Sequence, residues 1–266
     1  LIPTMGALHG GHAALVRRAR AENDVVAVSI FVNPLQFGDP ADLEHYPRTL
    51  DADLDLLAAA GADVVFAPDV QEMYPGYPDA PIVTVSAGRM GEVLEGASRP
   101  GHFDGVATVV AKLWNIVRPA APVLRSYFGQ KDAQQLLLIK RMVRDLDMSV
   151  EIVGVPTVRE SDGLALSSRN AYLSDADREV ALCLSKALQA GEAARNSGPA
   201  AVRRAARDVL VREPLALVDY LVLVDPVTLE QVPEYFRGEA LLAVAAKVGT
   251  TRLIDNVPLV VGGREA

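Results

Sequence analysis

The stretch VVAVSIFV, residues 25–32, decides the fold of this chain, because it is a continuous apolar run. Eight residues are too few for a core helix, while a run rich in β-branched side chains suits a strand that is buried on both faces. Similar short runs follow at 63–67, 127–128 and 150–155. Strands of this kind belong to parallel sheets that helices cover, so the sequence predicts an α/β fold.

A predicted helix lies between two of these strands. It begins after Thr49, a possible N-cap, and stops at Gly61. Its apolar face is expected to contain Leu50, Leu54, Leu57 and Ala58. A second apolar stripe at helical spacing runs from Val106 to Val117, and Pro119 ends it. Both helices are expected to pack against the sheet.

The pattern changes after about Pro156. A capping-box-like sequence at 174–177 opens a predicted helix, and a second helix is expected over 200–212. Three predicted strands follow at 218–224, 239–248 and 251–256. Because strands and helices no longer alternate, this half is predicted to be a smaller α+β domain.

The chain has 266 residues, half of them hydrophobic, and 26 basic against 34 acidic side chains give a net charge of −8. This composition is typical of a soluble globular protein, and its acidity disfavours binding to long nucleic acids. No run approaches the roughly 20 apolar residues of a membrane span. A single cysteine, Cys183, excludes an intrachain disulfide and suits the reducing cytoplasm. Because the chain begins with Leu1 and a short apolar segment, its first strand is expected to be clipped at the N-terminus.

The segment PTMGALHGGH, residues 3–12, is the first candidate site. A strand ends here, glycines allow a close turn, and His9 and His12 stand at the start of a helix. Backbone N–H groups and the helix dipole favour anions at such a start, and imidazoles can donate to phosphate oxygens. The alternative is an ordinary glycine turn with surface histidines, while a metal site would need a third, distant ligand. The paired histidines favour chemistry on a nucleotide phosphate.

Two further segments follow predicted strands. FVNPLQFG, residues 31–38, places Asn33 and Gln36 beyond the carboxyl end of a strand, where open α/β sheets bind ligands. The alternative there is an Asn-Pro turn with a solvated Gln. In YFGQKDAQQ, residues 127–135, Lys131 stands at a turn and can neutralise polyphosphate charge. Asp132 either caps the following helix or approaches a phosphate-bound Mg²⁺, and the sequence leaves both open.

Two glycine-bearing loops carry further polar groups. The SSR sequence at 167–169, within DGLALSSRN, can bind several phosphate oxygens at once, although the loop could equally be a polar linker. Arg99 and His102 lie in a second loop, which is either structural or part of the same site.

Asp51, Asp53 and Asp55 resemble a metal-binding array. Their spacing lets only Asp51 and Asp55 share a face of a helix. Acidic side chains in a first helical turn are favourable in themselves, and this explains the three residues adequately.

The segment PTMGALHGGH resembles the HxGH signature of nucleotidyltransferases and class I aminoacyl-tRNA synthetases. Taken in order with FVNPLQFG, YPRT, RPGHFDGV, FGQKDAQQL and LALSSRN, it resembles the pantothenate synthetase family from Pro3 to about Leu173, and more loosely through GTTRLIDN at 249–256. The resemblance implies an α/β, Rossmann-like parallel-sheet domain over residues 1–157 that binds ATP and pantoate. A smaller α+β C-terminal domain over 158–266 would carry the SSRN loop.

The same resemblance implies the reaction and the partners. The enzyme would join pantoate to β-alanine with ATP and Mg²⁺ through a pantoyl-adenylate, releasing AMP and pyrophosphate. It would be a cytoplasmic homodimer with no nucleic-acid or membrane partner. One departure from the family is the long stretch at 120–125, which could shift the loop that carries Lys131.

The resemblance also implies roles for individual residues. His12 would act as the acid and His9 would assist it, while Lys131 and Arg169 supply fixed positive charge. Gln36 would contact pantoate and β-alanine, Gln135 would hold pantoate, and Asn33 is expected in the same substrate site. The ATP site is expected to contain Met5, Gly6, Ala7, Leu8, His9, Gly10, Gly11, His12, Gly129, Gln130, Lys131, Asp132, Val158, Leu166, Ser167, Ser168 and Arg169.

Two other functions stay open. A nucleotidyltransferase would stop after adenylyl transfer, but it would have no use for a small hydroxy-acid pocket containing Gln36 and Gln135. A nucleotide-binding fragment could be catalytically impaired by its shortened start, although the four catalytic candidates are intact. A Rossmann dehydrogenase is disfavoured, because the first turn lacks GxGxxG and carries histidines instead.

Overall fold

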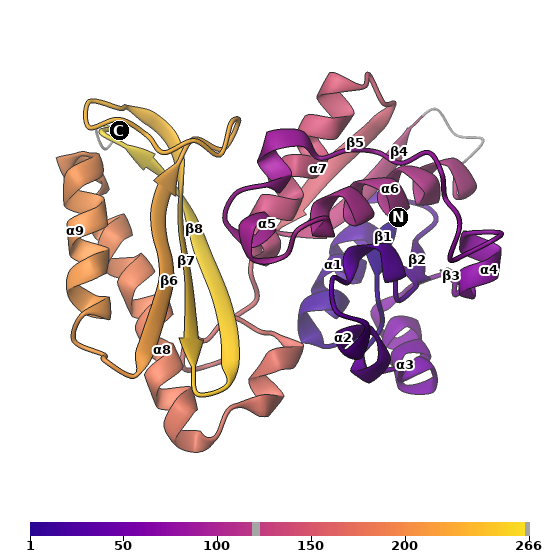
Figure 1. The fold of residues 1–266 in the computed structure, drawn as a ribbon, viewed down its shortest axis with the longest axis horizontal. Helices are drawn as coiled ribbons and strands as arrows, with labels where there is room; N and C mark the ends of the chain where they lie inside the picture. The colour runs from indigo at the N-terminus through magenta and orange to yellow at the C-terminus, as the bar shows by residue number, and fades with distance from the viewer. Residues whose placement is uncertain (119–122, 264–266) are drawn as a thin grey trace. The chain divides into compact units, whose positions relative to one another are not determined.

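The computed structural model describes residues 1–118 and 123–263, which fold into two compact units (Figure 1). The first unit contains Leu1–Gln130 and Gln134–Pro156. The second contains Lys131–Ala133 and the chain from Thr157 onward. The parallel sheet and the separate antiparallel sheet described below confirm the predicted combination of an α/β and an α+β part.

The first unit is built on parallel strands. β1 (Ile2–Thr4), β2 (Ala27–Ile30) and β3 (Val64–Phe66) form one sheet in the order β1-β2-β3, and β4 (Leu124–Gly129) pairs with β5 (Val150–Val155). Leu1 joins the two sheets: its carbonyl accepts from Tyr127 N–H at 2.9 Å, and its nitrogen donates to the Arg125 carbonyl at 2.7 Å. The five strands therefore follow the order β3-β2-β1-β4-β5, which is the order of a Rossmann sheet.

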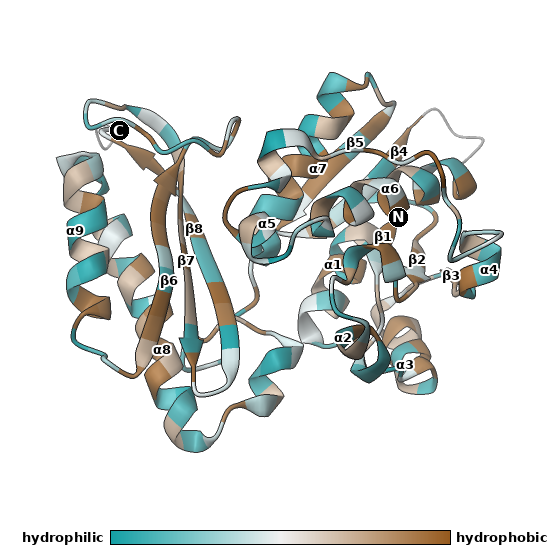
Figure 2. Ribbon diagram, viewed as in Figure 1, coloured by the Kyte–Doolittle hydropathy of each residue, from teal (hydrophilic) through white to brown (hydrophobic). Residues whose placement is uncertain are grey.

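Four longer helices accompany these strands: α1 (Gly10–Glu22), α3 (Leu50–Ala60), α6 (His102–Ile116) and α7 (Ala133–Asp145). Three short helices, α2 (Pro40–His45), α4 (Val70–Met73) and α5 (Glu95–Ser98), lie in the connections. Ile2, Val16, Val28, Leu57 and Tyr127 belong to one core cluster of this unit. In Figure 2 the brown, hydrophobic colour is prominent on strands such as β5 and β6, while the helices alternate brown and teal.

The strand predicted at 25–32 is shorter than expected. Its ladder covers only Ala27–Ile30, and Val25 is exposed. At its start, the Asp63 carboxylate accepts the Val26 N–H at 2.7 Å before the ladder begins. The prediction of β5 at 150–155 is confirmed residue for residue.

The apolar face predicted for α3 is wrong in part. Leu57 is buried, but Leu50 and Leu54 are 45% and 39% exposed, and Asp53 and Ala60 share the buried face instead. The helix is turned so that the Asp53 carboxylate points inward. Gly61 ends the helix in a left-handed conformation, as expected, with φ of 97°.

The second unit is an antiparallel sheet covered by two helices. β6 (Ala216–Val224), β7 (Gly238–Val248) and β8 (Thr251–Val261) form the sheet in chain order, and α8 (Asp175–Ala193) and α9 (Pro199–Leu210) pack against it. The helices and strands predicted for this half are confirmed, except that β8 continues to Val261, beyond the predicted end at 256. Ser174 caps α8 by accepting from Asp177 N–H at 3.1 Å. The core of this unit includes Leu188, Leu223, Leu242 and Val244.

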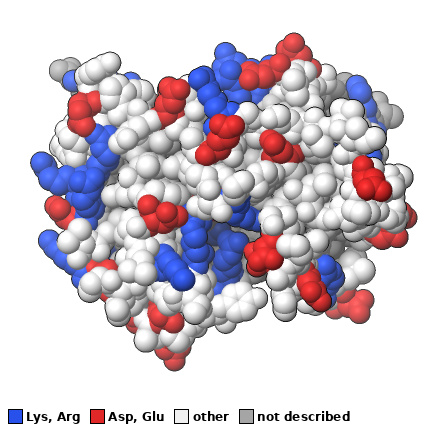
Figure 3. Space-filling view, in the orientation of Figure 1, with Lys and Arg blue, Asp and Glu red and all other residues white. Residues whose placement is uncertain are grey.

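Among residues 1–118 and 123–263, no helix has the length and apolarity that a membrane span requires. Residues 120–122 of the long stretch noted in the sequence lie outside the described residues, and β4 begins two residues later, at Leu124. Acidic and basic side chains are interspersed on the face that Figure 3 shows.

Candidate active site

The start of α1 is capped by two histidines. His9 is the N-cap residue, and its Nδ1 accepts the Gly11 N–H at 3.1 Å. The Nδ1 of His12 accepts the His9 N–H at 3.2 Å, and the two ring centroids are 4.2 Å apart. Because each Nδ1 is an acceptor, each neutral ring carries its hydrogen on Nε2. Both histidines therefore have an Nε2–H donor at the positive end of a helix.

The loop before these histidines is held by a buried carboxylate. Asp53 is only 2% exposed; its Oδ2 accepts the Ala7 N–H at 3.1 Å, and its Oδ1 accepts the Leu8 N–H at 2.8 Å and the Thr49 hydroxyl at 3.2 Å. Gly6 has φ of 84°, and a Cβ there would lie 3.0 Å from Asp53 Oδ2. The explanation of Asp53 as a favourable first-turn acid was therefore incomplete, because this side chain shapes the loop that leads to His9.

The Thr49 hydroxyl accepts no backbone N–H of the first turn of α3, although Thr49 occupies the predicted N-cap position. Its bond to Asp53 replaces that cap. Asp51 and Asp55 are exposed.

Asn33 is the centre of a buried hydrogen-bond network and is only 1% exposed. Its Nδ2 donates to Gln36 Oε1 and to the Gly105 carbonyl, both at 3.1 Å. Its Oδ1 accepts the Tyr74 hydroxyl at 2.9 Å and the Leu35 N–H at 3.3 Å. Burial raises the pKa of the Tyr74 hydroxyl, so it stays protonated and can donate. All polar atoms of the Asn33 side chain thus have partners inside the protein.

Gln36 is buried, so the alternative of a solvated Gln is wrong. Its Nε2 donates to Met5 Sδ at 3.0 Å, which links the loop after β2 to the loop after β1. The backbone carbonyl of Gln36 contacts the Nδ1 of His102 at 2.9 Å and accepts from Arg99 at 3.3 Å. Arg99 and His102 therefore hold the backbone that carries Gln36.

The approach of α6 to this network requires a glycine. A Cβ at Gly105 would lie 2.4 Å from the Leu35 carbonyl oxygen. The short 3-10 helix η1 (Pro34–Gln36) can pack this closely on α6 only because position 105 has no side chain.

The two neighbouring glutamines of α7 differ. Gln134 is buried; it accepts the Glu95 N–H at 3.0 Å and donates to the carbonyls of Met90 and Val93 at 2.9 and 2.8 Å. It holds a loop of the first unit. Gln135 is partly exposed, which leaves it as the candidate for contact with substrate.

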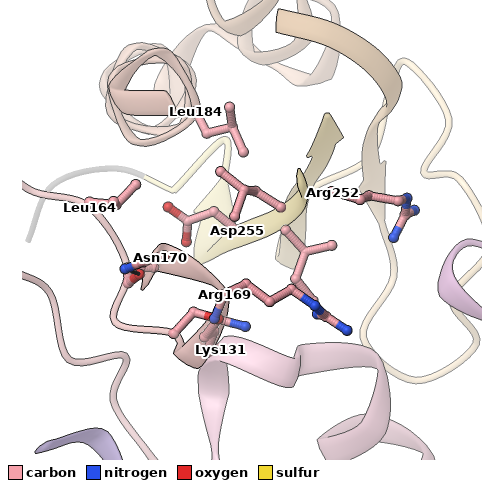
Figure 4. Close-up of a pocket in the computed structure, with 11 residues that line it drawn as sticks. Lys131, Leu164, Arg169, Asn170, Leu184, Arg252 and Asp255 are labelled. Atoms are coloured by element: carbon pink, nitrogen blue, oxygen red, sulfur yellow. Dashed lines mark hydrogen bonds between the residues drawn. The ribbon is translucent and has the colours of Figure 1, made fainter. Parts of the chain in front are cut away.

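The second unit contains a pocket of mixed polarity, drawn in Figure 4. Its polar lining comes from Lys131, Ser167, Arg169, Asn170, Arg252 and Asp255. The cations Lys131 and Arg169, expected from the sequence, are thus brought to one pocket. The sequence did not single out Arg252, which also pairs with Asp219 at 2.7 Å. A pocket with several cations favours an anionic ligand.

The remaining predicted nucleotide-binding residues lie near these groups in the chain. Gly129 ends β4, and Gln130 opens the 3-10 helix η3 (Gln130–Asp132). Asp132 is exposed and its carboxylate lies 3.5 Å from Lys131 Nζ. Val158 accepts the Leu166 N–H at 2.9 Å, so these two pair across the base of the loop that leads to Ser167. Ser167 caps the 3-10 helix η4 (Ser168–Tyr172).

The same loop is fixed to the rest of its unit by charged groups. Arg178 of α8 donates to Glu160 at 2.8 Å and to Asp162 at 2.6 Å, and Asn170 donates to Glu160 at 3.0 Å. The Arg178 and Asn170 bonds hold the pKa of Glu160 below its usual range. This loop is an ordered part of the second unit, and the interpretation of it as a mere polar linker is not needed.

No group of three or more His, Cys, Asp or Glu side chains among residues 1–118 and 123–263 is arranged to hold a metal ion. The histidines of the first unit are hydrogen-bond donors, and the pocket of the second unit contains cations. Such a set stabilises negative charge that develops on a phosphate and does not itself need a nucleophile.

Comparison of the sequence with known families gives a match over nearly the whole chain. The model of a family described as pantoate-beta-alanine ligase matches residues 1–258. A pantothenate synthetase of Paenarthrobacter aurescens is 57% identical over 97% of this chain and 91% of its own length. One from Thermobifida fusca is 59% identical over 97% of this chain and 88% of its own length.

Solved structures agree with the sequence comparison. A pantothenate synthetase from Thermus thermophilus matches with a TM-score of 0.87 at 51% identity, covering 96% of this chain and 91% of the other. A pantoate-beta-alanine ligase from Francisella tularensis, complexed with beta-gamma ATP and beta-alanine, matches with a TM-score of 0.73 at 37% identity, covering 96% and 87%.

Proposed function

This chain belongs to the pantoate-beta-alanine ligase family, and we propose that it condenses pantoate with β-alanine in an ATP-dependent reaction that yields pantothenate. The observation that carries this proposal is the family match over residues 1–258, together with identities above 50% over nearly the whole chain. The complex of the Francisella relative supports ATP and β-alanine as substrates. A pantothenate synthetase is an enzyme, and the proposal assigns that activity here.

The reaction has two steps. A pantoate carboxylate oxygen attacks the α-phosphorus of ATP, an acyl–phosphate bond forms, and the bond to pyrophosphate breaks. The neutral amine of β-alanine then attacks the activated carbonyl carbon, the bond from that carbon to the phosphate oxygen breaks, and AMP leaves. The nitrogen loses one proton to solvent as the amide forms. The first step brings one anion onto another, so donors and cations that are fixed before the reaction are what the protein must supply.

We assign the donors of the first unit to the phosphates. His12 and His9 have Nε2–H donors at the start of α1, and their Nδ1 atoms are engaged by backbone N–H groups. We keep His12 as the acid and His9 as its assistant. The backbone from Met5 to Gly11 completes this part of the proposed ATP site.

Pantoate and β-alanine are assigned to glutamines of the first unit. Gln36 and Gln135 are the proposed contacts, with Gln36 oriented by Asn33 at 3.1 Å. Because all the polar atoms of Asn33 have internal partners, its proposed part is to orient Gln36 and the substrate pocket.

The second unit is proposed to contribute cations and polar groups to ATP. Lys131 and Arg169 line one pocket there, together with Ser167. The further proposed nucleotide-binding residues are Gly129, Gln130, Asp132, Val158, Leu166 and Ser168. In this proposal residues 1–157 form the ATP- and pantoate-binding domain, and residues 158–266 form the C-terminal domain.

Mg²⁺ is proposed to arrive as part of the MgATP substrate. The described residues include no three-ligand cluster for a resident metal, and Mg²⁺ commonly keeps its waters and takes few protein ligands. The exposed carboxylate of Asp132 is the candidate contact. The family resemblance supports a cytoplasmic homodimer, and the single cysteine suits that location.

An assay of the purified chain tests the proposal. Pantothenate should form, with one AMP and one pyrophosphate for each amide bond, only when pantoate, β-alanine and MgATP are all present. ADP as the nucleotide product would refute the reaction. AMP retained in the product would favour the nucleotidyltransferase alternative, and ATP binding without turnover would favour a catalytically impaired fragment.

A further inference from the structure

β8 contains two adjacent buried residues that reach different loops. Asn256 donates through Nδ2 to the Lys131 carbonyl at 2.8 Å, 125 residues away in the chain. Both Asn256 and Lys131 belong to the second unit. The backbone of the residue that carries the proposed phosphate-binding ammonium is therefore tied directly to a strand.

The neighbouring residue, Asp255, reaches the other loop. Its carboxylate accepts two hydrogen bonds from the Arg159 guanidinium, at 2.7 and 3.0 Å. Arg159 also donates to the Gly163 carbonyl at 3.1 Å and forms a β-bridge with Ala165. This bidentate ion pair therefore fixes the base of the hairpin that leads into the SSR sequence at 167–169.

The strand itself explains how adjacent residues can serve separate loops. β8 pairs with β7 in continuous register from Thr251 to Val261, and successive side chains of such a strand point to opposite faces. Asp255 and Asn256 thus leave the strand in different directions. Both residues are buried, while the bonds they make are partly buried, because the Arg159 side chain is 30% exposed.

Resting on the function proposed above, we propose that Asp255 and Asn256 are positioning residues for the polyphosphate of ATP. They hold the loops of Lys131 and Arg169 so that both cations line one pocket before the anion arrives (Figure 4). Like charges in one pocket repel each other, and a loop free to move would separate them. Fixing the backbone in advance keeps the two cations in one pocket and lowers the cost of ordering them when the anion binds.

A double-mutant cycle tests the link between Asn256 and Lys131. Asn256→Ser, Lys131→Ala and the double variant are compared for affinity toward an ATP analogue with a non-hydrolysable β,γ bridge, by calorimetry, and for turnover. Asn256→Ser should lower both by about 10-fold to 100-fold, since a displacement of about 1 Å can cost about 10²-fold in rate. The KM for pantoate should stay within about twofold. In the Lys131→Ala background, Asn256→Ser should cause no further loss, because residues that act through one another are not additive.

The control variant is judged by the same two measurements, analogue affinity and turnover. Asn196→Ser, an exposed amide of the same unit, should leave affinity and turnover unchanged. Losses that multiply in the double variant, or wild-type affinity in Asn256→Ser, would overturn the proposal. If Asn256→Ser does not fold, Asn256→Thr, which suits a strand, replaces it. Failure of both to fold would also overturn it, by assigning Asn256 to the stability of the unit.

A parallel cycle tests Asp255 through its partner. Arg159→Gln, Arg169→Ala and their double variant should again be non-additive in analogue affinity, and multiplying losses would overturn this half of the proposal. Analogue affinity does not depend on which product forms. Absence of pantothenate from the wild-type reaction would therefore refute the proposed function while both cycles still report on positioning.

Discussion

His12 accepts the backbone N–H of His9 through its Nδ1 atom at 3.2 Å, so one edge of the imidazole is a helix cap and the opposite edge is a donor. The two edges have separable consequences. The Nδ1 bond stabilises the start of α1, and the Nε2–H is the group proposed to act on phosphate. A substitution that keeps only the first edge can therefore separate stability from catalysis.

Replacing His12 by Asn should keep the cap and remove the donor edge. The Asn carbonyl can accept the His9 N–H, whereas His12→Ala loses that bond and about 1 kcal/mol of stability with it. Both variants should lose about 10²-fold to 10³-fold in turnover, as for other donors that act on developing charge. Urea denaturation and the rate of AMP formation measure the two effects. Near-normal turnover in His12→Asn would contradict the role given to Nε2.

Replacing Asp53 by Asn should destabilise the protein and slow the reaction. An Asn keeps one acceptor oxygen and turns an NH₂ group toward a backbone N–H of Ala7 or Leu8. The expected loss of unfolding free energy is about 1–3 kcal/mol. Turnover should fall because the loop before His9 shifts. The exposed neighbour Asp55→Asn is the matched control and should change neither quantity. Equal behaviour of the two variants would refute the role of Asp53.

Removing the Tyr74 hydroxyl should weaken the binding of pantoate. In Tyr74→Phe the Asn33 Oδ1 loses its 2.9 Å donor and keeps only the Leu35 N–H at 3.3 Å, so the amide that orients Gln36 is held less firmly. The KM for pantoate should rise about 10-fold, as expected from about 1.4 kcal/mol for one buried hydrogen bond, while the KM for ATP stays near its wild-type value. Tyr235→Phe, at an exposed position, serves as the control. A larger change in the KM for ATP than in the KM for pantoate would count against this assignment.

Cys183 should make stability depend on alkaline pH. Burial raises the pKa of this thiol to about 11, above the ordinary value near 9. Between these two pH values the unfolded chain loses the thiol proton and the folded chain keeps it. The free energy of unfolding should therefore decrease as the pH rises from about 9 toward 11. Denaturation at pH 7 and pH 10 should show that the free energy of unfolding decreases less with pH in Cys183→Ala than in the wild type. An equal decrease of the unfolding free energy in the variant and the wild type would refute the raised pKa of Cys183.

Much of the fold could be predicted because it depends on short-range patterns. The β5 run at 150–155 and the strands of the second unit show their apolar character within a few residues, and Gly61 gives a local signal for the end of α3. The same holds for the two histidines, since a glycine turn before an apolar stripe indicates a helix start. These helices and strands could be located along the sequence without knowing which distant residues they contact.

The parts that could not be predicted depend on partners far away in the chain. Asp53 is buried because it binds backbone N–H groups 45 and 46 residues away, and nothing in its neighbourhood distinguishes it from Asp51 and Asp55. Its inward turn also exposes Leu54, against the apolar pattern. Tyr74 directly follows the short helix α4 and reaches Asn33 across 41 residues. A polar group buried by a long-range bond leaves no periodic signal.

The missing side chain at position 105 also limits which sequences can encode this fold. Every amino acid except glycine carries the Cβ that would meet the Leu35 carbonyl oxygen at 2.4 Å. Any missense change in that codon therefore pushes η1 away from α6 and, with it, the glutamine that η1 carries. In a library with every substitution at every position, codon 105 should tolerate none, although it encodes no group that takes part in the chemistry.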